Sequence, residues 1–203
     1  IYLYFLQDKI GTWDNPVISR AERNNPQINW KSSWKNWNCS RGITPQLKYF
    51  GWCLTQDMVH VPARNHRKGV SKECKRMVYD EDLNEMLLCG KHGDLTHTMA
   101  DCLSTRDKFL NLKGIMESLL GKVISTEEII FLSFRHADKK KVKVAVWTAI
   151  SSLNFIFKKP DASCDDMLRV LKEELYYHEL LERGFVRKRY ISDLLEILEN
   201  WEI

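Results

Sequence analysis

Residues 144–157 read Val144-Ala-Val-Trp-Thr-Ala-Ile-Ser-Ser-Leu-Asn-Phe-Ile-Phe157, and this stretch decides the fold. A helix with this sequence carries apolar side chains on most of its faces, which is typical of a helix buried at the centre of a protein. The basic run Lys139–Lys143 precedes it, and Lys158-Lys159-Pro160 closes it. The sequence therefore predicts a central buried helix over residues 138–158.

The segments that flank this helix carry helix signals of their own. Residues 105–120 place their apolar side chains on one stripe, and Gly121 is typical of a helix C-terminus. Ser125-Thr-Glu-Glu128 has the form of a capping box at the start of a short helix. Two more helices are predicted, one from Ser163 to Gly184 and one over residues 191–202. We expect a mainly α fold, an irregular helical bundle.

The N-terminal part is less regular. Residues 1–28 contain Gly and Pro interruptions and are expected to form an irregular segment. Trp30, Trp34 and Trp37 then share one face of a predicted helix, because their spacing is i, i+4 and i+7. This stripe indicates a helix docked on the core, and stacking on nucleic-acid bases is the alternative. Thr44-Pro45 marks the start of a second helix.

Residues 89–102 read Cys89-Gly-Lys-His-Gly-Asp-Leu-Thr-His-Thr-Met-Ala-Asp-Cys102, with metal donors spaced C-x2-H-x4-H-x4-C. Thiolate and imidazole groups are the ligands that Zn²⁺ takes in tetrahedral structural sites. The predicted ligands are Cys89, His92, His97 and Cys102. An ordinary turn with Cys102 buried as a small apolar residue is the alternative. Cys74 is a further candidate donor, whereas the thioether of Met86 suits softer ions than zinc.

Composition limits the class of protein. With 203 residues, 44% of them hydrophobic and 29% charged, the chain is typical of a globular protein. The net charge of +4 permits a nucleic-acid partner without requiring one. The uneven spacing of the six cysteines indicates reduced thiols, and hence the nucleus or the cytoplasm. No membrane partner is expected, because no apolar run approaches the roughly 20 residues of a membrane span. Because the first residue is Ile1, we expect a piece of a longer protein.

Basic residues gather in three places along the chain, and Arg and Lys are the natural donors to phosphate groups. The candidate nucleic-acid contacts are Arg64, Arg67, Lys68, Lys72, Lys139, Lys140, Lys141, Lys143, Arg187, Lys188 and Arg189. Solvated charge is the alternative, and the acidic segments 161–182 and 193–202 would repel phosphate. RNA or DNA is therefore the expected partner only if the basic clusters converge in the fold.

Nothing in the sequence predicts catalysis. Tyr79-Asp-Glu-Asp82 has the composition of a polymerase metal site, but no strand pattern precedes it to supply a third carboxylate. We therefore expect an acidic turn or the acidic first turn of a helix there. No pairing of a nucleophile with a base is visible, so this segment is not expected to be an enzyme alone.

The order of these features resembles the region that follows the polymerase in reverse transcriptases of LINE-type (non-LTR) retrotransposons. In that family a Trp-x-x-x-Trp helix, a Leu-x-x-Phe helix, a basic loop and a zinc element follow one another. The corresponding features here are Trp30 with Trp34, residues 47–54, residues 64–76 and residues 86–102. Further on, Lys158-Lys-Pro-Asp-Ala-Ser163 and the segment after it resemble the family's Lys-Pro helix junction. The resemblance implies a role in gripping template RNA or target DNA beside a polymerase.

The zinc element departs from the family's pattern at one position. The family form is C-x2-C-x7-8-H-x4-C, and this chain reads Met86-x2-Cys89-x7-His97-x4-Cys102. His92 is expected to take the vacant place, with Cys74 as a second possibility. A lost site is the third, and it would indicate a degenerate or host-adopted copy.

These observations predict four regions and one function. The regions are an irregular segment (1–28), a helical region with a basic loop (29–78), a zinc-knuckle-like element (79–104) and a C-terminal helical bundle (105–203). The predicted function is that of a non-catalytic nucleic-acid-binding module with one structural Zn²⁺. A helical protein-interaction scaffold is the competing prediction. A domain that only packs against the polymerase portion of a longer chain is a third.

Overall fold

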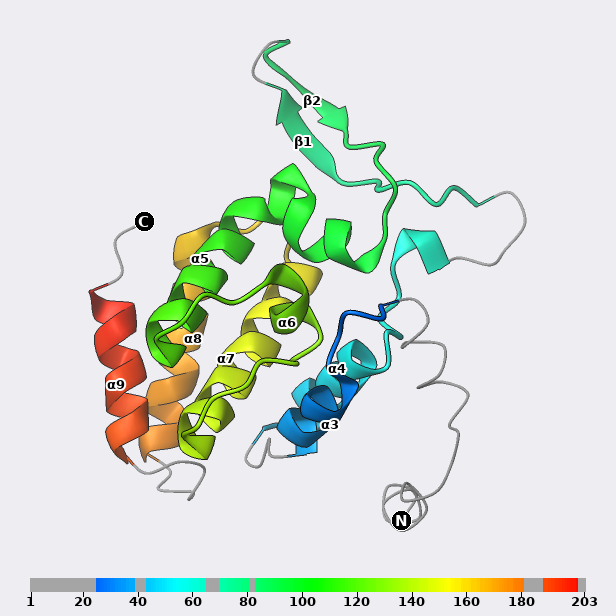
Figure 1. Ribbon diagram of the computed structural model, residues 1–203. Coiled ribbons are helices and arrows are strands. Elements are labelled where there is room, and N and C mark those ends of the chain that lie inside the picture. The colour runs from blue at the N-terminus through cyan, green and yellow to red at the C-terminus, as the bar shows by residue number, and fades with distance from the viewer. Residues whose placement is uncertain (1–24, 39–42, 65–69, 81–82, 181–187, 201–203) are drawn as a thin grey trace.

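The computed structural model describes residues 25–38, 43–64, 70–80, 83–180 and 188–200, with only the backbone described over 177–180 and 188–193. Within these ranges the fold is mainly α, as predicted (Figure 1). The main helices are α3 (Trp30–Asn38), α4 (Pro45–Thr55), α5 (Leu103–Leu120), α6 (Thr126–Ile130), α7 (Lys139–Lys158), α8 (Cys164–Leu180) and α9 (Lys188–Glu199). The remaining elements are the one-turn helices η1 (Pro62–Arg64) and η2 (His97–Asp101) and the strands β1 (Met77–Asp80) and β2 (Glu85–Leu88). No described helix is long and apolar enough to cross a membrane.

Helix α7 lies at the centre of the bundle, which confirms the prediction from its sequence. It packs against α3 and α4 on one side and against α5, α8 and α9 on the other (Figure 1). Trp147, Ile150 and Leu153 on α7 are almost completely buried. One hydrophobic core therefore runs from Ile28 to Leu198, through helices of both halves of the chain.

The helix ends predicted at Ser125, Gly121 and Thr44 are confirmed, and the one predicted at Gly184 lies outside the described residues. Ser125 Oγ accepts a hydrogen bond from the Glu128 N–H, and the Glu128 carboxylate accepts one from the Ser125 N–H, both at 3.1 Å. Gly121 ends α5 with a φ of 63°, a left-handed conformation that favours glycine. Thr44 caps α4, and Pro45 begins it. These local signals depend on neighbouring residues alone, which is why the sequence could supply them.

Helix α3 packs on the core through its tryptophans, as their i, i+4, i+7 spacing predicted. Trp30 is buried edge-to-face against Phe131, with ring centroids 5.4 Å apart. Two polar side chains on the same helix form hydrogen bonds to the segment after α6. Ser33 Oγ donates to the carbonyl of Phe131, and Asn36 Nδ2 donates to the carbonyls of Leu132 and Phe134 at 2.7 Å each.

Helices α4 and α7 approach closely at Gly51. A Cβ atom at this position would lie 2.7 Å from Ile150 Cδ1 and 3.3 Å from Trp37 Cδ1. We expect Gly51→Ala to destabilise the protein by about 1 kcal/mol, because overpacking a buried contact outweighs the gain in helix propensity. In the Ile150→Val background, which removes Cδ1 and leaves the contacts at 3.2 Å and 3.3 Å, the same change should cost clearly less, about 0.5 kcal/mol or below. Urea unfolding of the four proteins measures both values, and equal effects in the two backgrounds would contradict this packing.

Strands β1 and β2 form an antiparallel hairpin that projects from the bundle (Figure 1). Tyr79 and Asp80 belong to β1, which corrects the expectation of an acidic turn or helix start at these two residues, and Glu81 and Asp82 lie outside the described residues. Met77 pairs with Leu88 and Tyr79 with Met86, so these four side chains share one face of the hairpin. All four are exposed, at 42–63% of their surface.

Candidate metal centre

Four side chains from four short segments converge where the hairpin joins the bundle. Cys74 precedes β1, Cys89 follows β2, His97 begins η2, and Cys102 is the residue before α5. Backbone hydrogen bonds extend the hairpin ladder beyond its strands, from Cys74 N to Lys91 O at 2.7 Å and from Cys89 N to Arg76 O at 2.9 Å. This pairing holds Cys74 and Cys89 side by side, although they are separated in the sequence.

The spacing of the donor atoms fits a tetrahedral metal ion. The Sγ atom of Cys102 lies 3.8 Å from that of Cys74 and 3.9 Å from that of Cys89, and Cys89 Sγ lies 3.4 Å from His97 Nε2. All four ligand atoms lie within 4.8 Å of one another. A tetrahedral Zn²⁺ with bonds of about 2.3 Å separates its sulfur ligands by about 3.8 Å. The cluster could therefore hold a metal ion without rearrangement.

Burial affects the pKa values of Cys74, His97 and Cys102. Cys74, His97 and Cys102 are buried, and Cys89 is half-buried. Burial raises the pKa of Cys74 to about 11, because desolvation disfavours the thiolate. Burial also lowers the pKa of His97, which favours the neutral imidazole that a metal requires. At Cys102 burial raises the pKa, but hydrogen bonds with Ser104, Cys74 and Cys89 together outweigh it, so the pKa is lowered.

The surrounding chain fixes the loop that carries the histidine. The carboxylate of Asp94 accepts a hydrogen bond of 2.8 Å from the His97 N–H. A Cβ atom at Gly93 would lie 2.8 Å from Pro62 Cβ, so only glycine fits where the loop passes η1. Arg76 donates to the carbonyl of Thr98 and so ties the base of the hairpin to η2. Outer partners of this kind orient the ligands of a metal site.

The structure brings together three of the four predicted ligands and replaces the fourth. His92 is exposed, its backbone forms an isolated bridge with Glu73, and its side chain is not part of the cluster. The geometry thus corrects the expected Cys-His-His-Cys set to Cys74, Cys89, His97 and Cys102. The reason is that Cys74 is paired with Gly90 and Lys91 across the extended hairpin, whereas His92, the next residue, is exposed. Met86 is 53% exposed on the free face of the hairpin, away from the donors.

The predicted nucleic-acid contacts are placed unequally. Arg64 is ion-paired with Asp57 and donates to the carbonyl of Val59 at 2.9 Å, which corrects its assignment to an open basic loop. Lys72, Lys139 and Lys140 are exposed, and Lys141 and Lys143 are half-buried. Arg67, Lys68 and Arg187 lie outside the described residues, as do the side chains of Lys188 and Arg189.

The fold and the cluster define a class of protein: a mainly helical protein with a candidate metal centre of three cysteines and one histidine. No family model, curated protein or solved structure matches the chain. The assignment of a role therefore rests on the geometry of the site and of the surface.

Proposed function

We propose that this protein is a non-catalytic nucleic-acid-binding module that a structural zinc ion holds in shape. Three thiolates and one imidazole are soft and borderline donors, and this set favours Zn²⁺ over Mg²⁺ or Ca²⁺. Four protein ligands leave no coordination position for water or substrate, so the ion would organise structure rather than catalyse. The ion would join the base of the hairpin to the start of α5.

The observation that carries the nucleic-acid role is a convergence of basic side chains from distant parts of the sequence. Lys31 and Lys35 lie on α3, Arg135 precedes α7, and Lys139 is the first residue of α7. All four line the same hollow. Clustered cations raise the local potential and release counterions when they bind a phosphate backbone. The order of sequence motifs, which resembles the region beside a LINE-type polymerase, supports the same proposal. On this proposal the module grips template RNA or target DNA.

Salt dependence tests the proposed function. Four lysine and arginine contacts to a single strand give a slope of log affinity against log salt of about −3, because each contact contributes roughly −0.7. We expect this slope for a 20-nucleotide single-stranded RNA or DNA, measured by fluorescence anisotropy between about 50 and 200 mM salt. Absence of binding at the lowest salt, or an affinity that does not change with salt, would remove the nucleic-acid role.

One observation favours the second candidate, a protein-interaction scaffold. The free hairpin face carries Met77, Tyr79, Met86 and Leu88, all exposed. Contiguous exposed apolar side chains of this kind are typical of protein contact surfaces. The same titration separates the two candidates, because the apolar face contributes no salt-dependent affinity for nucleic acid.

A further inference from the structure

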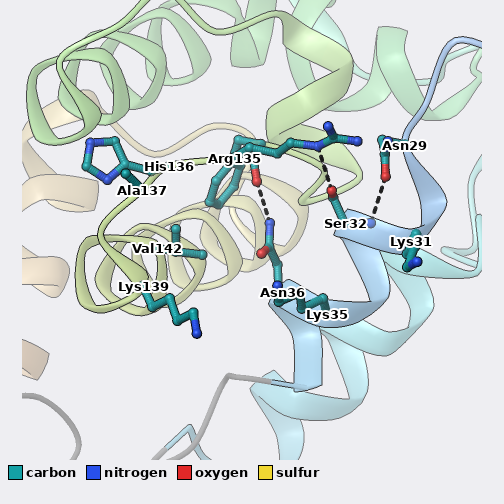
Figure 2. A pocket seen from close by; sticks show the side chains of 11 residues that line it. Asn29, Lys31, Ser32, Lys35, Asn36, Arg135, His136, Ala137, Lys139 and Val142 are labelled. Carbon is teal, nitrogen blue, oxygen red and sulfur yellow. Dashed lines mark hydrogen bonds between the residues drawn. The ribbon is translucent and has the colours of Figure 1, made fainter.

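A hollow of about 450 Å³ lies between α3, the segment after α6 and the first turns of α7. Figure 2 shows side chains from α3 on one wall and those of residues 135–137, Lys139 and Val142 on the other. Four of its lining residues are cations, namely Lys31, Lys35, Arg135 and Lys139, and none is acidic. Its size falls within the range of small-molecule and nucleotide sites, roughly 300–1,000 Å³.

We propose that this hollow binds a phosphate group of a nucleic-acid chain, an inference that rests on the proposed function above. Arg135 is the central donor. Its Nε–H donates to Ser32 Oγ at 2.9 Å, which holds the guanidinium across the hollow toward α3 (Figure 2). An arginine fixed in this way offers its remaining N–H groups as a planar fork, the geometry that matches phosphate oxygens.

The charge balance of the hollow favours an anion. Within the described ranges, no carboxylate forms an ion pair with any of the four lining cations. Asp138 is the acidic residue closest in sequence to Arg135 and Lys139, and its side chain does not line the hollow. Its carboxylate accepts a hydrogen bond of 2.8 Å from the Lys140 N–H and caps α7. Among the described residues, none of the four cations therefore has an ion-pair partner, and a bound phosphate would lie next to all of them.

The walls of the hollow are held in place before any ligand binds. Asn36 lies on its α3 side and is fixed by its two hydrogen bonds to the carbonyls of Leu132 and Phe134. These bonds join α3 to the chain immediately before Arg135. A site whose donors are already positioned loses little conformational entropy when it binds. The arrangement is thus suited to a specific phosphate contact and not only to diffuse attraction.

The test compares two triple variants of equal net charge. Lys31→Gln with Lys35→Gln and Lys139→Gln removes three lining charges, and Lys113→Gln with Lys122→Gln and Lys172→Gln removes three that do not line the hollow. At about 0.1 M salt each lost contact weakens single-strand binding about fivefold, so the first variant should lose about 100-fold. Its salt slope should become shallower by about 2. The control should lose far less, and both should melt at temperatures near that of the wild type.

A second measurement on the unmodified protein does not depend on how the variants fold. Bound RNA should protect Lys31, Lys35 and Lys139 from chemical acetylation, as measured by mass spectrometry, and should leave Lys113 and Lys122 reactive. Protection of both groups, or equal losses in both triple variants, would overturn the pocket assignment while leaving the proposed function intact.

The source of the phosphate is resolved by competition. If the site holds a chain phosphate, inorganic phosphate or ATP at 1 mM should displace the RNA only weakly, as expected from their ionic strength alone. Displacement by micromolar ATP that the lining triple variant abolishes would instead identify a free nucleotide site and overturn the chain-phosphate assignment. A wild-type protein that binds no RNA would refute the proposed function and this inference together.

Discussion

Replacing Cys102 by serine is expected to abolish stoichiometric zinc binding. The wild type should carry about one zinc ion per chain, and the variant should carry essentially none, because Cys102 Sγ lies beside both other sulfurs and is itself buried. A metal that binds only the folded state stabilises it by about 4 kcal/mol when its free concentration is a thousandfold above Kd. Elemental mass spectrometry measures the zinc, and thermal unfolding with and without a chelator measures the stability.

Three further variants establish which residues form the set. Cys74→Ser should lose the zinc like Cys102→Ser, whereas His92→Ala should retain it, because His92 lies outside the cluster. Cys53→Ser is the matched control, a buried cysteine that is not a member of the cluster. Zinc that is lost in His92→Ala and kept in Cys74→Ser would restore the ligand set expected from spacing alone and contradict the geometry.

The helices were predictable because their signals are local. Apolar spacing located α5 and α7, Gly121 marked the end of α5, and Ser125 marked the start of α6. The hairpin was not predictable in the same way. Residues 77–79 and 86–88 are apolar on both faces, so they lack the alternation that identifies a strand with one face in solvent. Because the exposed face is apolar as well, the sequence shows no alternation of apolar and polar residues in these strands.

The metal site was predictable to the extent that its ligands are near in sequence. Cys89, His97 and Cys102 lie close together in the sequence, within residues 89–102, and their spacing indicates a metal site. Cys74 joins them only through strand pairing, so its membership depended on the hairpin that the sequence did not reveal. The hollow lined by basic residues was even less predictable from the sequence. Lys35 and Arg135 line it together only because α3 packs beside α7.

Lys108 is a buried lysine on α5 that the sequence analysis did not identify as part of the core. The structure buries it, with 6% of its surface exposed. Its ammonium group donates to the carbonyls of Ser104, Pro160 and Ala162, each at 2.7 Å. Burial lowers the pKa of Lys108, because desolvation disfavours the charged ammonium group. The contacts fasten the turn between α7 and α8 onto α5.

Lys108→Met is expected to destabilise the protein by about 2–4 kcal/mol. Each of the three charge-assisted hydrogen bonds stabilises the folded state by roughly 1.5–3 kcal/mol. The substitution also removes the cost of desolvating a buried charge, which offsets several kcal/mol of this loss. The loss dominates because three carbonyls that converge on one point lose a donor that methionine cannot replace. Lys113→Met, the same substitution at a half-buried site on α5, should change stability by less than about 0.5 kcal/mol. Urea unfolding compares the two, and equal costs would show that Lys108 contributes only its volume to the fold.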